Sequence, residues 1–76
     1  MNLQTFAEPT QHTLEAIERA IRLRTSGQIR DLHVDLSDGE LILTGRTSTY
    51  YTKQLATHAV LDLVDDLGLS NDIEVR

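Results

Sequence analysis

Residues 29–45 read IRDLHVDLSDGELILTG, and apolar residues recur at every second position on both sides of Asp38-Gly39. A period of two is typical of a β-strand with one buried face. Asp-Gly between two such runs favours a two-residue hairpin turn, because the central residues of that turn need positive φ. The pairs expected from this turn are Leu36 with Leu41, Val34 with Leu43, and Leu32 with Gly45. The sequence therefore predicts an antiparallel hairpin, in which Gly39 has a structural role.

Two segments with a helical period flank the hairpin. The first begins near Thr13 and stops at Ser26-Gly27. The second begins near Thr49, a good N-cap, and is expected to run to Leu67. Gly68 then fits the left-handed position just past a helix end, which gives it a structural role. The positions that share the two inward faces are Leu14, Ile17, Ile21 and Arg24 in the first helix, and Leu55, Ala56, Ala59, Val60, Leu63 and Leu67 in the second.

A last strand is predicted at residues 71–75, NDIEV, where apolar and acidic residues alternate. The order α-β-β-α-β indicates an α+β fold with two layers, a three-stranded sheet and both helices on its single apolar face. The last strand can lie beside the first or the second strand, with a right-handed crossover in either case. Gly45 points toward the helices in this arrangement, where a missing side chain lets a helix approach or lets the strand bend.

The size and charge of the chain limit its class. Its 76 residues suit one small domain, expected at residues 10–76 after a flexible arm at residues 1–9. Twelve acidic and seven basic residues give a net charge of −5, which repels nucleic acid at long range. There is no cysteine, no signal peptide is evident, and no apolar run is long enough for a membrane span. A cytoplasmic location is expected if the chain is complete.

Three segments resemble the BON domain, a small bacterial module named for osmotically induced and nodulation proteins. Residues 34–45, VDLSDGELILTG, are similar to the family pattern v-x-V-x-d-G-x-v-x-L-x-G. Residues 47–56, TSTYYTKQLA, follow V-x-S-x-x-x-K-x-x-A, with Thr47 in place of the usual valine. Residues 71–75, NDIEV, match N-x-I-x-V, although Asp65-Asp66 stands where the family has Gly-Val before this strand. The resemblance implies attachment to membranes or phospholipid, often in envelope proteins, rather than catalysis.

The start of the second helix is a candidate anion site. Thr47, Ser48 and Thr49 supply hydroxyl groups, the helix supplies free N–H groups, and Lys53 supplies a positive charge. A phosphate such as a lipid headgroup fits this set of donors. The alternative is structural, with the Lys53 stem on apolar surface and its ammonium paired with a carboxylate.

A second candidate surface lies on the outer side of the same helix. Tyr50, Leu61 and Val64 fall on one line, and Tyr51 lies nearer the helix edge, where it is expected to be half buried. Such a strip fits a partner protein or a second copy of the chain in a weak homodimer. The alternative is that Val64 simply packs on the first helix.

The uncovered sheet face carries Asp31, His33 and Asp35, which suggest either a metal site or, more simply, a solvated acidic face. Catalytic signatures such as G-x-S-x-G, H-E-x-x-H and a glycine-rich phosphate loop are absent from the sequence. The chain is therefore expected to be a non-catalytic binding module with no cofactor and no metal. Its expected function is protein interaction or self-association; the alternative is attachment to phospholipid or envelope components through the anion site.

Overall fold

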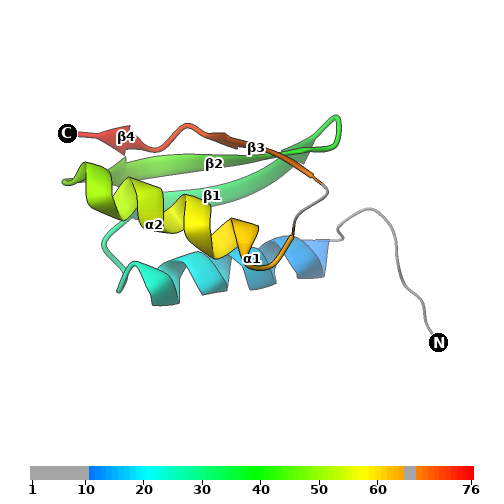
Figure 1. Ribbon diagram of the computed structural model, residues 1–76, viewed down its shortest axis with the longest axis horizontal. Helices are drawn as coiled ribbons and strands as arrows, with labels where there is room; N and C mark the ends of the chain where they lie inside the picture. Colours follow the sequence, from blue (N-terminus) through cyan, green and yellow to red (C-terminus); the bar gives the residue numbers. More distant parts are fainter. Residues whose placement is uncertain (1–10, 65–66) are drawn as a thin grey trace.

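Two helices lie on one face of a mixed β-sheet in the computed structural model, which describes residues 11–64 and 67–76 (Figure 1). The elements are α1 (Gln11–Arg24), β1 (Arg30–Ser37), β2 (Glu40–Thr47), α2 (Tyr50–Leu61), β3 (Gly68–Asn71) and β4 (Glu74–Val75). The predicted α+β class and the order of helices and strands are confirmed. The proposed arm at residues 1–9 lies outside the described residues.

The last strand lies beside β2, so β2 is the centre of the sheet and β1 is one edge. It is divided into β3 and β4, which makes four strands where the sequence predicted three. Both pieces are parallel to β2 and keep the same register, with Leu43 beside Asn71 and Arg46 beside Glu74. The division is therefore an interruption at residues 72–73 within one line of pairing.

The hairpin between β1 and β2 has the predicted turn. Asp38 has φ 52° and Gly39 has φ 76°, as a type I′ turn requires. The predicted pairs of Leu36 with Leu41 and Val34 with Leu43 are present. The apolar face of the hairpin is therefore the one that the sequence pattern indicated.

The regular pairing of β1 with β2 ends at His33, so the predicted pair of Leu32 with Gly45 is not formed. His33 pairs with Thr44 and Arg30 with Arg46, so two residues of β1, Asp31 and Leu32, lie opposite Gly45. This is a β-bulge, and Asp31 takes the left-handed conformation with φ 54°. Ile29 and Leu32 are both buried although they are three residues apart, and one extra residue between them is what allows both to point inward.

Gly45 is required by the bulge rather than by a helix. A Cβ atom at this position would lie 2.8 Å from Ile29 Cγ2 and 2.9 Å from the Arg30 carbonyl oxygen. Gly45 also has φ 148°, a conformation that side chains rarely adopt. The close approach comes from the start of β1, whereas the approach of a helix was one of the two roles expected for Gly45.

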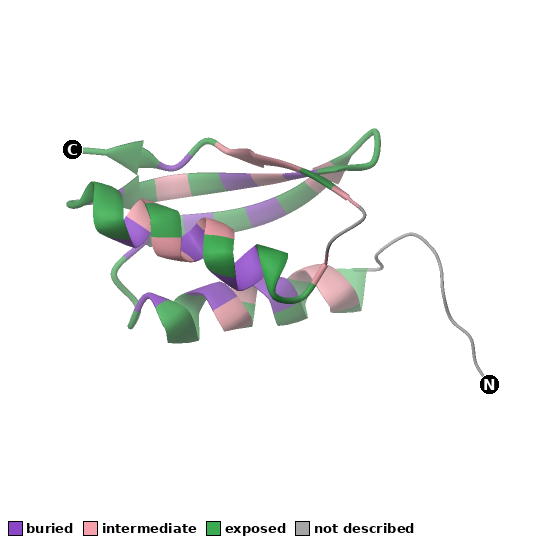
Figure 2. Ribbon diagram, in the orientation of Figure 1, coloured by how far each residue is buried: buried purple, intermediate pink, exposed green. Residues whose placement is uncertain are grey.

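The core is aliphatic, and its buried residues are spread along α1, β1, β2 and α2 (Figure 2). Both helices contribute, with Ile17 and Ile21 from α1 and Val60 from α2 almost fully buried. Leu14, Leu36, Val64, Leu67 and Leu69 pack around this cluster while partly exposed. The remaining buried apolar residues are Ile29, Leu32, Val34, Leu41, Leu43, Ala56, Ala59 and Ile73.

Helix α2 is shorter than predicted. It ends at Leu61, with Asp62 as its C-cap, and not at Leu67. Leu63 is therefore 54% exposed instead of buried, and Gly68 is the first residue of β3 instead of a helix cap. The chain has to leave the helix early because β3 must begin opposite Glu40 at the turn end of the sheet. Asp65-Asp66, which departs from the BON pattern, lies outside the described residues.

Candidate functional site

Three arginine side chains come together at the end of the sheet where β1 begins and β2 finishes. Arg30 comes from β1, Arg46 from β2, and Arg76 from the residue after β4. They line a cavity of about 320 Å³, which we call the arginine pocket. Its lining residues are Gln28, Arg30, Arg46, Thr47, Ser48 and Arg76.

The bulge is what brings Arg30 into the arginine pocket. In an unbroken ladder Arg30 would lie opposite Thr47, whose side chain belongs to the covered face of β2. The extra residue shifts the register by one, so Arg30 pairs with Arg46 and both point to the open side. Arg76 is held beside them by its backbone N–H, which donates to the Thr47 carbonyl oxygen at 3.0 Å.

The charges in the arginine pocket are only partly neutralised. Arg46 forms an ion pair with Asp31 at 2.6 Å, and Arg76 lies 3.6 Å from Glu74. Arg30 has no carboxylate within ion-pair distance in the part of the chain that the structure describes. Like charges on directly opposed residues destabilise a sheet, so the Arg30–Arg46 pair favours a bound anion.

Neutral hydrogen-bond donors also line the arginine pocket. Thr47 is only 7% exposed, yet its hydroxyl makes no hydrogen bond to any residue in 11–64 or 67–76. Its side chain lies on the covered face of β2, opposite the face to which Arg30 and Arg46 point, so this hydroxyl is not one of the donors that meet the arginine side chains. The Gln28 side-chain oxygen accepts from Thr52 at 3.3 Å, which leaves its NH₂ group available. The site can therefore hold an anion by charge and by hydrogen bonds, and its lining contains no acid–base group for catalysis.

The structure divides the four residues that were predicted to bind an anion. Thr47 and Ser48 line the arginine pocket, but Thr49 is the N-cap of α2 and accepts the Thr52 N–H at 3.1 Å. The hydroxyl oxygens of Thr49 and Thr52 are also 2.8 Å apart, so the Thr49 side chain is already used in the cap.

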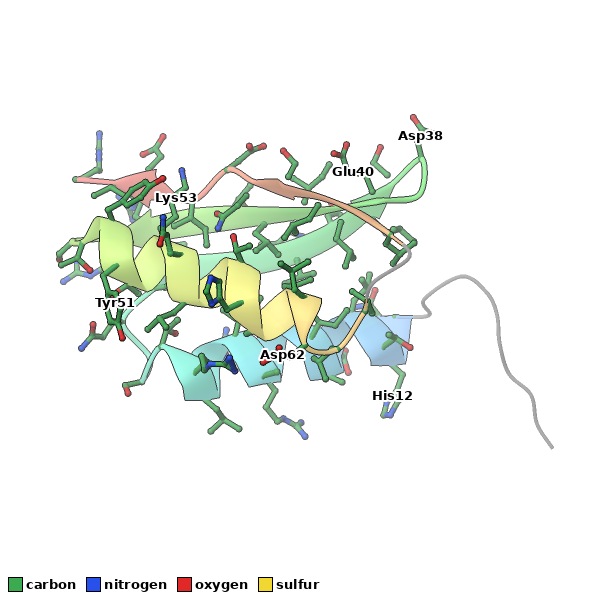
Figure 3. The ribbon with its side chains drawn as sticks, viewed as in Figure 1. His12, Asp38, Glu40, Tyr51, Lys53 and Asp62 are labelled. Atoms are coloured by element: carbon green, nitrogen blue, oxygen red, sulfur yellow. The ribbon has the colours of Figure 1, made fainter. Side chains whose placement is uncertain are left out.

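Lys53 lies elsewhere. It leaves α2 on the side opposite Tyr51 and lines two other cavities together with Tyr50 (Figure 3). No described carboxylate pairs with its ammonium, so the structural alternative for Lys53, an ion pair, is not found within residues 11–64 and 67–76.

Sequence reasoning missed the three arginines and Gln28, because they are far apart in the chain and share no motif. One signal was present. The buried residues Ile29 and Leu32 are separated by three positions next to a run with a period of two. That spacing indicates a bulge, and a bulge places Arg30 beside Arg46.

The expected partner surface on α2 is not continuous. Tyr50 is 62% exposed and Leu61 is 54% exposed, but eleven residues separate them, which is about 16 Å along a helix. Val64 is half buried and packs against the buried core cluster. Tyr51 is 71% exposed, so the expectation that it is half buried is wrong.

Both edges of the sheet are poor sites for adding a strand. At the β1 edge, the Asp35 carboxylate accepts the Leu36 backbone N–H at 3.1 Å, and the bulge at Asp31 and Leu32 bends the strand. The other edge is interrupted between β3 and β4. Blocked donors, bulges and short strands are the devices by which proteins avoid edge-to-edge pairing.

The open face of the sheet carries the acidic residues that suggested a metal site. His33 Nε2 lies 3.8 Å from Asp35 Oδ2, while Asp31 turns away to pair with Arg46. Among the described residues no group of three metal-binding side chains is found. Neither of the two described helices has the length and apolar character needed to cross a bilayer.

No family model matches the chain, and no curated protein or solved structure matches it either. The resemblance to BON domains rests on the three sequence segments described above and stays a prediction.

Proposed function

We propose that this chain is a non-catalytic binding module that attaches to its partner by holding an anionic group in the arginine pocket. The observation that carries the proposal is the meeting of three arginines, from three separate segments, around a cavity in a protein of net charge −5. The predicted anion site is thereby moved from the start of α2 to the end of the sheet. The attachment role that the BON resemblance implies is consistent with this proposal.

The electrostatic attraction between the arginine pocket and an anion is local rather than long-range. At physiological ionic strength charges more than about 8 Å apart are largely screened, so the net charge of −5 has little influence inside the pocket. Guanidinium groups bind oxyanions with parallel N–H bonds, and Arg30 has all of its donors free of ion pairs among the described residues. Because the arginine side chains are largely solvated, we expect affinities from micromolar to millimolar.

Self-association through α2 is the less supported function. Tyr50 and Leu61 are separated by Gln54 and Thr57 on the same side of the helix, and Val64 is used in the core. Strand addition would need an open edge, and both edges are interrupted. The structure therefore favours anion binding over an apolar interface.

The experiment is a titration of the ¹⁵N-labelled chain with sodium sulfate, followed by amide chemical shifts at constant ionic strength set with sodium chloride. We expect the shifts to concentrate at residues 28–31, 46–48 and 76. Arg30→Glu should abolish them.

Two control variants carry the same change of charge. Arg19→Glu alters an exposed residue of α1 that has no ion pair among the described residues, and Lys53→Glu tests the site first expected at α2. Both should keep the sulfate-dependent shifts. Equal loss in Arg30→Glu and Arg19→Glu would show that net charge, rather than the pocket, governs binding, and would refute the proposal.

A further inference from the structure

We infer that the partner held by the arginine pocket is a second copy of this chain, and that the two copies meet through the open faces of their sheets in a weak dimer. This inference rests on the proposed function and names its partner. It follows from an uncovered sheet face, from the opposite charges at the two ends of that face, and from the symmetry that those charges favour.

The open face of the sheet is a surface that no described element covers, because both helices lie on the other face (Figure 1). Exposure alternates along the central strand β2, and the residues that point to the open face are Glu40, Ile42, Thr44 and Arg46. Ile42 is half buried and lies between Asp35 and Ser70 of the neighbouring strands. An apolar side chain therefore occupies the middle of a polar face.

The two ends of the open face carry opposite charge. Asp38 and Glu40 lie at the turn end (Figure 3). Together with Asp35 they have no arginine or lysine within ion-pair distance in the part of the chain that the structure describes. At the other end, the three arginines of the pocket are paired with only two carboxylates, Asp31 and Glu74, which leaves one positive charge. The face is thus polarised along its strands.

One symmetric arrangement of two open faces brings these opposite charges together. Aligned sheets that pack face to face keep their strand directions within about 30° of each other, so a twofold axis between them runs either along the strands or across them. An axis along the strands would place the arginine pocket of one copy on that of the other. An axis across the strands instead sets the turn end of each copy over the arginine pocket of the other. The charges favour this second arrangement, which we call the antiparallel dimer.

The antiparallel dimer predicts its contacts residue by residue. With the axis crossing the middle of β2, Glu40 faces Arg46 of the second copy, and the symmetry repeats this contact. The order along β1 is the same, so Asp35 is brought toward Arg30 of the second copy. One carboxylate neutralises the single positive charge that the pocket retains, and guanidinium–carboxylate hydrogen bonds are among the strong ones. The open face is therefore self-complementary.

The size of the open face limits the strength of the dimer. Strands β1 and β2 have 8 residues each, which is about 26 Å in length, and three lines of strand are about 14 Å wide. A flat contact then covers about 370 Å² on each copy, well below the 800 Å² or so per partner of a stable interface. The net charge of −5 on both copies also opposes contact, although charges more than about 8 Å apart are screened at physiological ionic strength. We therefore expect a dissociation constant in the millimolar range.

The test is a dilution series of the ¹⁵N-labelled chain from millimolar to micromolar concentration at physiological salt, followed by amide shifts and by sedimentation equilibrium. We expect a dimer at the highest concentration, with concentration-dependent shifts centred on residues 30–35 and 40–46. Sodium sulfate at constant ionic strength should convert the dimer to monomer, because sulfate competes for the same arginines. A chain that is monomeric at millimolar concentration, or a dimer that sulfate leaves intact while it binds the pocket, would overturn the inference.

Reversal of one charge pair tests the antiparallel arrangement itself. Glu40→Arg and Arg46→Glu should each weaken the dimer about fivefold or more, because each places like charges opposite one another in both symmetric contacts. The double variant restores opposite charges and should dimerise within about threefold of the unchanged chain. Both residues are exposed, and the urea midpoint of each variant shows that it is folded. Glu15→Arg on α1 makes the same change of net charge as Glu40→Arg, and this control should dimerise at least as well as the unchanged chain.

Failure of the inference is distinguishable from failure of the proposed function. Sulfate-dependent shifts at the arginine pocket of a chain that stays monomeric keep the proposed function and overturn the inference, whereas the absence of both sulfate shifts and a dimer refutes both. A dimer that both single reversals leave unchanged uses another surface. A double variant as weak as the single variants shows that Glu40 and Arg46 do not face each other. Either of these last two results overturns the inference.

Discussion

Replacing Gly45 with alanine tests the bulge and, with it, the position of Arg30. The added Cβ would lie 2.8 Å from Ile29 Cγ2, 2.9 Å from the Arg30 carbonyl oxygen and 3.3 Å from Leu32 Cα. Two of these three neighbours are backbone atoms, which cannot move without shifting β1. The substitution therefore acts on the pairing of β1 with β2 and not on a flexible side chain.

The cost of Gly45→Ala has two parts. Overpacking a tightly packed site costs about 1–3 kcal/mol, and holding a side chain at φ 148° costs about another 1–3 kcal/mol. The lower backbone entropy of alanine in the unfolded chain reduces this cost by about 0.4–1 kcal/mol. We expect a net loss of about 1–5 kcal/mol, which is a large part of the stability of a domain below 80 residues.

Urea unfolding followed by circular dichroism measures this loss. With a slope of about 1 kcal/mol per molar urea for a small domain, the midpoint should fall by about 1 M or more. Gly68→Ala is the control, because its Cβ would meet only the Glu40 side chain, at 3.4 Å or more, and its φ is not positive. A Gly45→Ala variant within about 0.5 kcal/mol of the unchanged protein, or as stable as Gly68→Ala, would refute the reasoning.

Three further outcomes are expected. Gly39→Val should lower the free energy of unfolding by about 1–3 kcal/mol in the same assay, because a β-branched residue is poorly tolerated at φ 76°; an unchanged midpoint would contradict the type I′ turn. Ser26→Gly should raise it by about 0.5 kcal/mol, since Ser26 has φ 55° in the turn that follows α1 and glycine adopts this conformation at lower cost; a lower midpoint would contradict this explanation. Asp31→Asn should raise the affinity for sulfate about two- to fivefold in the amide-shift titration, because Arg46 loses its carboxylate while asparagine tolerates φ 54°; weaker binding would show that Asp31 mainly positions Arg46.

Local rules explain which parts of the fold could be predicted from the sequence. The turn at Asp38-Gly39 depends on φ values that few residues adopt, and the inward residues of β1 follow from a period of two. Helix α1 ends at Arg24, just before the predicted stop signal Ser26-Gly27, and the Gly27 N–H donates to the Arg22 carbonyl oxygen at 3.0 Å. In each case the signal lies within a few consecutive residues.

The features that were not predicted depend on pairing between distant segments. The end of α2 at Leu61 is set by the position of β3 beside β2, and the helical pattern beyond Leu61 contains no information about that position. The arginine pocket likewise depends on the bulge in β1 and on the docking of Arg76 against Thr47. Thr47 and Ser48 were found because they lie at the end of β2, whereas Lys53 was assigned to the same site by its closeness in sequence alone.

The two-residue strand β4 makes the arginine pocket depend on local unfolding. The pocket's first two arginines belong to a hairpin that closes through a tight turn, whereas Arg76 follows a strand of only two exposed residues, Glu74 and Val75. We expect such a segment to open at a free energy below that of global unfolding, and its amide protons to exchange early. A ligand that contacts Arg76 stabilises the state in which β4 is paired with β2, and it therefore slows this exchange. Its observed affinity is reduced by the free energy needed to pair the segment. The C-terminal segment is therefore expected to be both one wall of the proposed binding site and a part that opens before the hairpin does.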